Sequence, residues 1–149
     1  MMRPFRAGHA TSCASPRYIA RHGSPRSAAD LTMHDCIIGW RRIPRPVWLL
    51  NDDAGKTFAQ PIRVRHELSD GEALLASTML GAGLCQLPTW LIGEHLKRGE
   101  LVSVLDSLAG AEMPIHAVWP RSPHVQPKVR VVIDALSQVS RARGSGFRP

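Results

Sequence analysis

The sequence predicts an α/β fold in which a mixed sheet is flanked by helices. Short apolar runs that suit strands alternate with segments whose apolar residues recur every three to four positions, as on one face of a helix. Most of these helical segments begin at serine, threonine or aspartate and end near glycine, the residues that cap helices. Strands that alternate with helices form a sheet with right-handed crossovers.

The first forty residues predict two strands and two helical segments. Residues 11–15 suit a short strand, and Ser15 then caps a helix that ends near Gly23. Residues 27–30 begin with serine and end with aspartate, which indicates a helical turn opened by a capping box. Residues 36–40 form an apolar run that predicts a buried strand.

A hairpin and a half-exposed strand are expected next. Residues 47–50 are apolar, and residues 52–55 read D-D-A-G, which is typical of a turn. Residues 56–60 are then the returning strand of a hairpin. Residues 62–68 alternate between apolar and polar side chains, which is the period of a strand with one exposed face.

The strongest helix start in the chain lies at Ser69. Glu72 follows three positions later, so the two side chains are expected to form a capping box in which each accepts from an unpaired backbone N–H. The helix over residues 70–80 places four side chains on one face, namely Leu74, Leu75, Thr78 and Met79. Gly81 and Gly83 mark the end of this helix and a tight turn.

The last third of the chain continues the alternation. Residues 84–88 predict a strand, Thr89 caps a helix that ends at residue 98, and residues 101–105 and 114–120 predict two further strands. A final helix over residues 128–140 is amphipathic. Its apolar stripe consists of Val129, Val132, Ile133, Leu136 and Val139.

Positive charge is concentrated at the two ends of the chain. The net charge of the 149 residues is +7; residues 1–45 carry eight arginines against two aspartates, and residues 121–149 carry six basic residues against Asp134. Residues 1–10 and 141–149 are expected to be disordered. Basic tails bind nucleic acid non-specifically and salt-dependently; solvated tails without a partner are the alternative.

The sequence contains no recognisable metal site, enzyme motif or membrane segment. Cys13, Cys36 and Cys85 lie in or beside predicted strands, where free cysteine packs as a small apolar residue; a redox switch is the alternative. Hydrolase, metalloprotease, P-loop and dinucleotide-binding motifs are absent, as are a signal peptide and an apolar run of about 18 residues. We therefore expect no catalysis, no cofactor, no metal, no membrane contact and a cytoplasmic location.

Four segments carry motifs that occur together in one family. Residues 14–25 read A-S-P-R-Y-I-A-R-H-G-S-P, and residues 29–38 contain A-D-L and H-D-C-I-I. Residues 69–88 contain S-D-G-E-A-L and G-A-G-L-C-Q-L-P, and residues 113–134 contain M-P-I-H-A-V-W-P, P-K-V-R and I-D. In this order and spacing, residues 12–140 resemble the effector-binding domain of LysR-type transcriptional regulators, whereas residues 1–10 do not.

The resemblance implies the second lobe of a type 2 periplasmic-binding-protein-like domain. Residues 11–120 would form this lobe with its crossover strands, and residues 121–140 would be a remnant of the first lobe. The helix-turn-helix and most of the first lobe are missing, so the chain looks like a truncated, C-terminal piece of a regulator. The implied function is to sense a small metabolite by closure of two lobes, with self-association through lobe surfaces and DNA bound only by a domain absent from this chain.

The start of the helix after residue 69 is the leading ligand candidate. Free backbone N–H groups and the positive end of the helix dipole favour a carboxylate-bearing effector near Ser69, Asp70 and Gly71. The alternative for Ser69 is that it only caps its own helix. Arg41 and Arg42 would clamp an acidic effector or remain solvated.

The resemblance adds positions on both sides of the cleft between the lobes. These positions are Ile38, Gly39 and Trp40, and Ile115, His116 and Ala117. Trp40 would cover the effector or pack in the core. His116 would hydrogen-bond a carboxylate or occupy an ordinary surface position on a strand.

Two other functions stay open at this point. The chain would be a free-standing solute-binding or regulator-interaction module without DNA binding, or a truncated gene product without activity.

Overall fold

The computed structural model describes residues 2–5, 9–39, 45–112, 115–120 and 125–141. The chain divides into two compact units. Residues 9–111 form the larger unit, and the smaller one is built from both ends of the chain.

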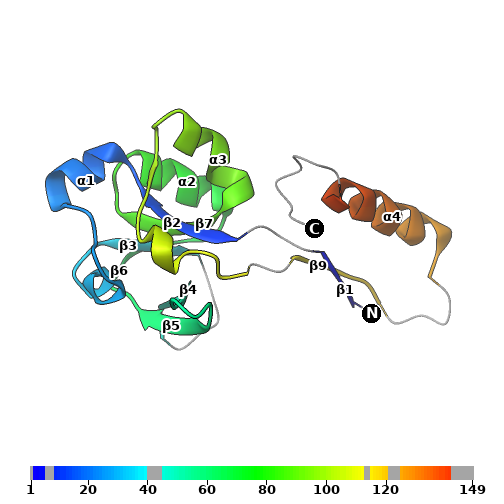
Figure 1. Ribbon diagram of the computed structural model, residues 1–149. Coiled ribbons are helices and arrows are strands. Elements are labelled where there is room, and N and C mark those ends of the chain that lie inside the picture. Colours follow the sequence, from blue (N-terminus) through cyan, green and yellow to red (C-terminus); the bar gives the residue numbers. More distant parts are fainter. Residues whose placement is uncertain (1, 6–8, 40–44, 113–114, 121–124, 142–149) are drawn as a thin grey trace. The chain divides into compact units, whose positions relative to one another are not determined.

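The larger unit is organised around a five-stranded mixed sheet (Figure 1). The strand order is β6-β3-β7-β2-β8. The strands are β2 (Ala10–Ala14), β3 (Cys36–Gly39), β6 (Val64–Leu68), β7 (Leu84–Pro88) and β8 (Val102–Ser103). β3 runs parallel to β6 and β7, whereas β2 runs antiparallel to β7 and β8. The predicted mixed α/β sheet is thus confirmed.

Both faces of this sheet are buried. Cys36 and Leu84 belong to one apolar cluster, whereas their neighbours Ile37 and Cys85 belong to another. Successive side chains of a strand point to opposite faces, so each cluster fills one side of the sheet.

Different elements supply the two clusters. The first includes side chains from α1 (Pro16–His22), η1 (Ala28–Thr32) and the hairpin of β4 (Val47–Asn51) and β5 (Thr57–Pro61), with η2 (Asp106–Leu108) at its edge. The second includes side chains from α2 (Gly71–Met79) and α3 (Thr89–Lys97).

Local signals explain the first helical segments and the hairpin. The Ser15 hydroxyl accepts from the Tyr18 N–H at 3.2 Å, and Gly23, with φ at 78°, ends α1 as predicted. The Asp30 carboxylate accepts from the backbone N–H groups of Arg26 and Ser27 at the start of η1. The hairpin expected around residues 52–55 is present, with β4 paired antiparallel to β5.

Three local predictions are corrected. The N-cap of α2 is Asp70, so the capping box of Ser69 and Glu72 does not form; aspartate caps as well as serine, and its carboxylate reaches the Ala73 N–H at 2.9 Å. Thr89 is the first helical residue of α3 and not its cap, because the chain enters the helix directly from Pro88. The strand predicted over residues 101–105 shortens to β8, since Leu105 adopts a left-handed conformation with φ at 56°.

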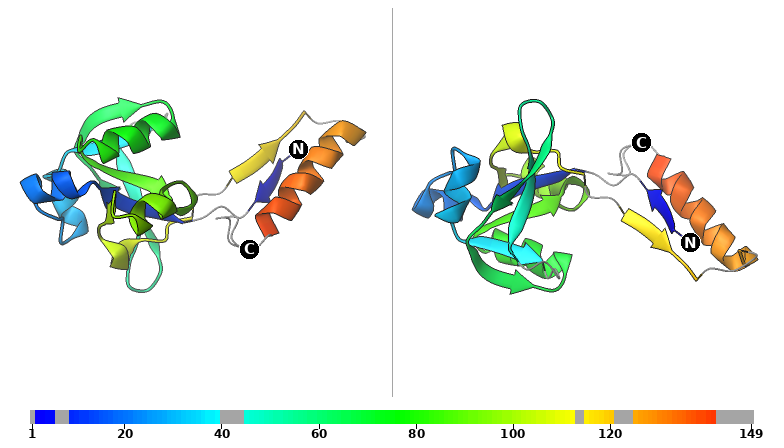
Figure 2. Two further views of the ribbon diagram at one scale, coloured as in Figure 1. Left: turned by 90° about the horizontal axis from the view of Figure 1, so that it is seen from above. Right: turned by 90° about the horizontal axis from the view of Figure 1, so that it is seen from below.

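The smaller unit contains a two-stranded sheet and one helix. β1 (Met2–Phe5) pairs antiparallel with β9 (Ile115–Val118), and α4 (Pro127–Arg141) lies beside this pair (Figure 2). The strand at Met2–Phe5 corrects the expectation that residues 1–10 lack regular structure. Nothing in the local sequence marks this strand, because its pairing partner lies more than a hundred positions away.

The amphipathic helix predicted near the C-terminus is α4. Its Ile133 and Ser137 are buried, whereas Val132, Leu136 and Val139 of the predicted stripe are 57%, 47% and 53% exposed. The smaller unit therefore covers only one edge of the apolar stripe. Across the described residues, no helix combines the length and apolar character needed to span a membrane.

Candidate effector-binding site

The carboxyl ends of three parallel strands meet at one edge of the larger sheet. β3 is paired with β6 on one side and with β7 on the other. The chain passes from β3 to β6 and then crosses back, through α2, to β7. In open α/β sheets, ligands bind outside the carboxyl ends of the strands, at the point where the strand order reverses about a central strand.

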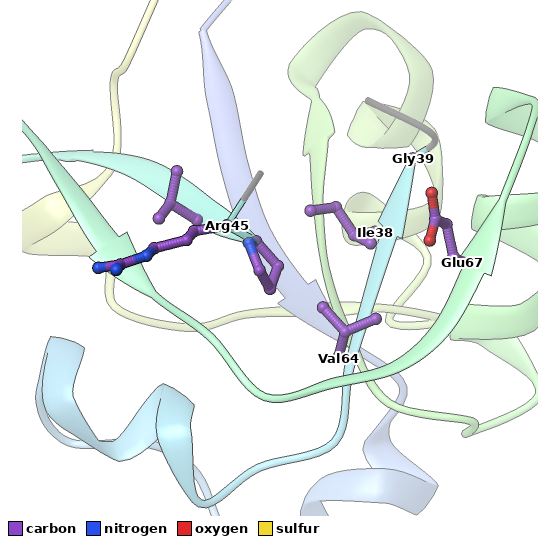
Figure 3. Close-up of a pocket in the computed structure, with 7 residues that line it drawn as sticks. Ile38, Gly39, Arg45, Val64 and Glu67 are labelled. Atoms are coloured by element: carbon purple, nitrogen blue, oxygen red, sulfur yellow. The ribbon is translucent and has the colours of Figure 1, made fainter. Parts of the chain in front are cut away.

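A hollow of about 150 Å³ lies at this edge. Its lining residues come from β3, β6 and the entry to the hairpin: Ile38, Gly39, Arg45, Pro46, Val47, Val64 and Glu67. Figure 3 shows the Glu67 carboxylate turned toward Gly39, whereas the Arg45 guanidinium points away from them. Four apolar side chains, those of Ile38, Pro46, Val47 and Val64, thus line the hollow, together with the charged residues Arg45 and Glu67.

The start of α2 lies beside the hollow. Gly39 is the register partner of Leu68, so Ser69, Asp70 and Gly71 follow directly at the same edge of the sheet. All three residues are exposed. A methyl group at Gly71 would meet only Leu91 Cδ2, at 3.6 Å, so packing inside the protein does not require glycine there. The first turn of α2 is open to a small molecule.

The protein's own carboxylates already lie at the N-terminus of α2. Asp70 accepts from the Ala73 N–H, and Glu72 lies in the first turn. Both interact favourably with the positive end of the helix dipole and use part of the attraction that an anionic ligand would receive. Glu67 adds a third carboxylate nearby. An anion at this site consequently binds less tightly than at a helix terminus without acidic residues.

The structure brings together five of the seven predicted site residues. Ile38 and Gly39 line the hollow, and Ser69, Asp70 and Gly71 stand at the same sheet edge. Trp40, like Arg41 and Arg42, lies outside the described residues.

The seventh predicted site residue belongs to the smaller unit. His116 lies on β9, is exposed and is the register partner of Pro4. His116 therefore belongs to a different unit from the residues that line the hollow.

Sequence reasoning missed several residues that line the hollow. Val64 and Glu67 belong to the strand that was predicted over residues 62–68. Because β3 and β6 are parallel, Glu67 pairs in register with Ile38. A parallel pairing of the two predicted strands would have identified Glu67. No comparable sequence pattern predicts that Pro46 and Val47, at the start of the hairpin, line the hollow.

The three cysteines are chemically shielded. Cys13, Cys36 and Cys85 are buried, and burial raises the pKa of Cys36 and of Cys85 to about 12 and that of Cys13 well above its usual range. A thiol is nucleophilic only as thiolate, so these thiols are unreactive in the folded protein. Their packing favours the structural interpretation over the redox switch. Within the described ranges, no group of three metal-ligating side chains is present.

The architecture agrees with comparisons to known proteins. The family described as the LysR substrate binding domain matches residues 2–141. The chain belongs to this family. The match begins within β1, which corrects the expectation that residues 1–10 bear no resemblance to it.

Curated relatives are transcriptional regulators. The chain is 29% identical over 124 residues to the HTH-type transcriptional regulator CrgA of Neisseria meningitidis serogroup C, covering 83% of this chain and 41% of CrgA. It is 32% identical over 129 residues to DmlR of Escherichia coli K12, covering 85% and 41% respectively. The chain thus spans about two fifths of the length of these relatives.

Solved structures of the family share the fold. The CrgA regulatory domain from Neisseria meningitidis has a TM-score of 0.73 at 26% identity, over 92% of this chain and 68% of that domain. The full-length Vibrio cholerae virulence activator AphB has a TM-score of 0.74 at 26% identity, over 93% and 47%. The periplasmic-binding-protein-like fold of LysR-type regulatory domains is therefore confirmed for this chain.

Proposed function

We propose that this chain is the effector-sensing part of a LysR-type transcriptional regulator. The observation that carries the proposal is the hollow at the carboxyl ends of β3 and β6, beside the open first turn of α2. Residues 9–111 would be the second lobe of the effector domain, and the smaller unit would belong to the first. A small metabolite that binds between two lobes favours their closed arrangement and shifts the population toward it.

The proposed site comprises Ile38, Gly39, Ser69, Asp70 and Gly71, and the two further predicted positions, Trp40 and His116, are retained as candidates. A carboxylate-bearing metabolite would receive hydrogen bonds from free N–H groups of the first turn, with a dipole contribution of about 0.3–1 kcal/mol at an exposed site. Because carboxylates already surround this terminus, we expect a dissociation constant no better than millimolar, roughly −4 kcal/mol.

A chemical-shift titration of the full chain with a panel of small carboxylates tests this site. The amides of Gly39, Ser69, Asp70 and Gly71 should move first. Gly71→Ala adds a methyl group to the first turn of α2, within 3.6 Å of Leu91 Cδ2, and should weaken binding. Gly93→Ala in α3, where a methyl meets no atom within 4 Å, is the matched control and should leave binding unchanged.

Two results would refute the site. Shifts confined to the arginine-rich ends of the chain would show non-specific anion binding. Micromolar affinity that Gly71→Ala does not change would place the effector elsewhere.

Regulation of transcription requires DNA contact, which we assign to a separate domain. LysR-type regulators sense small molecules, bind DNA through a separate domain and oligomerise. We propose the same organisation for the protein in which this chain acts, with self-association through lobe surfaces and a cytoplasmic location. Its relatives are named as transcriptional regulators, and we propose that this chain has no catalytic activity.

A second candidate function is a regulator-interaction module. The half-covered apolar stripe of α4 favours it, because exposed apolar faces mark interaction sites.

A further inference from the structure

The hairpin of the larger unit has an open backbone edge along β5. The Asp52 N–H donates to the Lys56 carbonyl at 2.9 Å, and the Ile62 N–H donates to the Pro46 carbonyl at 3.3 Å. These two pairs continue the β4–β5 register at its ends. Because hydrogen-bonded pairs alternate with non-bonded pairs in an antiparallel ladder, the odd-numbered residues of β5 turn their backbone groups away from β4. These residues are Thr57, Ala59 and Pro61.

The backbone groups of Thr57 and Ala59 are available to another strand. Pro61 has no N–H, and its carbonyl already accepts from Gln60 Nε2 at 2.9 Å. Among the described residues, no group bonds the outward N–H and C=O of Thr57 or Ala59, and both residues are exposed. The tip of the hairpin projects from the larger unit in both views of Figure 2. The edge thus offers two donors and two acceptors.

The other outer edges of the larger unit are protected against such pairing. On β4 the outward carbonyl of Leu49 accepts from Gln86 Nε2 at 2.7 Å. β6 carries charged side chains, and β8 is only two residues long. Charges and short strands are common means by which proteins prevent edge-to-edge pairing. Residues 57–60 carry no charge, so β5 is protected only by Pro61 at its end.

A second copy of β5 fits this edge in one antiparallel register. When Phe58 of each copy lies opposite Phe58 of the other, Thr57 of one copy faces Ala59 of the other. Each of these two facing pairs exchanges both N–H···O=C bonds, which gives four hydrogen bonds across the twofold axis. All the free groups of Thr57 and Ala59 are then used, and nothing is required of Pro61.

Charge does not oppose this pairing. Continued past the strand, the same register places Asp53 of each copy opposite Arg63 of the other, and these charges attract. Asp53 is exposed, and the Arg63 side chain is 56% exposed. Residues 9–111 contain eleven arginine and lysine residues against ten aspartate and glutamate residues, so two larger units have little net charge with which to repel each other.

We propose that β5 is a self-association surface on which two copies of this chain pair edge to edge, with Thr57 of one copy against Ala59 of the other, in a four-stranded sheet of two hairpins. It rests on the proposed self-association of lobes and names the strand that carries it. An interface of two such short strands buries less than roughly 1,200 Å² and is therefore weak. In a regulator whose other domains already associate, the effective concentration is about millimolar, where weak pairing becomes populated.

Sedimentation equilibrium of the full chain at concentrations up to millimolar tests the surface. Ala59→Pro removes the outward N–H, and proline is tolerated on an edge strand where the N–H faces solvent. Since each dimer loses two of its four edge hydrogen bonds, the dissociation constant should rise at least tenfold. Ala59→Ser keeps the N–H and should change it less than twofold. Urea unfolding of both variants verifies that the larger unit remains folded.

Disulfide cross-linking tests the register. Residues in a hydrogen-bonded pair have Cα atoms about 5.5 Å apart, within the reach of a disulfide. Under oxidised glutathione, a mixture of the Thr57→Cys and Ala59→Cys chains should cross-link at least fivefold more than either variant alone, because identical positions are offset by two residues. The native cysteines are buried and do not compete.

Each outcome bears on a different part of the proposal. A chain that stays monomeric at millimolar concentration would refute it, together with self-association through the larger unit. Dimerisation that Ala59→Pro leaves unchanged would assign association to another surface, so β5 would be excluded while the proposed function stands. Equal cross-linking in the mixture and in the single-variant samples would refute the register.

Discussion

Replacing Tyr18 with phenylalanine is expected to destabilise the larger unit by about 1–3 kcal/mol. The Tyr18 hydroxyl accepts from the Asp35 N–H at 3.0 Å and is 3.1 Å from His34 Nδ1. The Tyr18 side chain is 1% exposed, so water does not readily take the place of its hydroxyl group when that group is removed. Phenylalanine keeps the packing but leaves the partly buried Asp35 N–H without its acceptor, and an unsatisfied donor that is shielded from water costs about that amount.

Urea unfolding followed by tryptophan fluorescence measures the effect. Thr57→Val is the control, because it also removes one hydroxyl hydrogen bond, that to Asn51, at an exposed site. Its effect should stay within about 0.5 kcal/mol. A loss below 0.5 kcal/mol for Tyr18→Phe would mean that Asp35 N–H finds another partner and would refute the reasoning.

The same contact predicts a pH dependence. Because the phenol oxygen already accepts from Asp35 N–H, its own proton is available to His34 Nδ1, and protonation of His34 removes this acceptor. Burial lowers the pKa of His34, despite an opposing effect of Asp30. The unfolded state therefore binds the proton at a higher pH than the folded state. Stability should be complete above the ordinary histidine pKa of about 6.5 and fall as the pH drops from there toward the lowered folded value. His34→Asn should flatten this dependence; an unchanged profile would show that His34 is not its source.

Four further results are expected. Asp70→Ala should cost about 1 kcal/mol in urea unfolding through loss of the α2 cap, and an unchanged midpoint would show that the cap is dispensable. Deleting the chain from Val125 onward should raise solubility without lowering the melting temperature of residues 9–111; a lower temperature would show that α4 packs there. Duplex DNA retardation should vanish as salt rises, and a footprint on one operator at physiological salt would contradict this. Cys13, Cys36 and Cys85 should resist a thiol reagent at pH 8 until the protein is denatured, so rapid native labelling would contradict their burial.

Most elements of the larger unit were predictable because their signals are local. Ser15 and Gly23 bracket α1, and the turn at residues 52–55 sets the hairpin. The errors arose where two local signals compete or where pairing is distant. Ser69 and Asp70 are both good caps, and sequence alone does not decide between them. β1 depends on pairing with β9, which no local pattern reveals.

The candidate site was predictable only in part, for a related reason. Ser69 to Gly71 were identified from a helix-start pattern, and Ile38 and Gly39 from the family resemblance. Glu67 was missed because its position at the site follows from the parallel register of two strands separated by the hairpin. The charged residues that a neighbouring strand contributes to a site can be predicted only when the register of the two strands is known.

The pairing of β1 with β9 has a consequence for the order of folding. Phe5 and Ile115 are register partners 110 positions apart, and closing a flexible loop of that length costs about 4 kcal/mol plus a constant. The Ala10 N–H donates to the Ala111 carbonyl at 3.0 Å, so folding of residues 9–111 brings the chain on both sides together. The remaining gap is then roughly ten residues, for which the same relation gives about 2 kcal/mol. During synthesis β1 emerges before the larger unit, yet it has no partner until more than a hundred further residues are made and folded. Its pairing is therefore a late event that reports whether the larger unit has reached its native state.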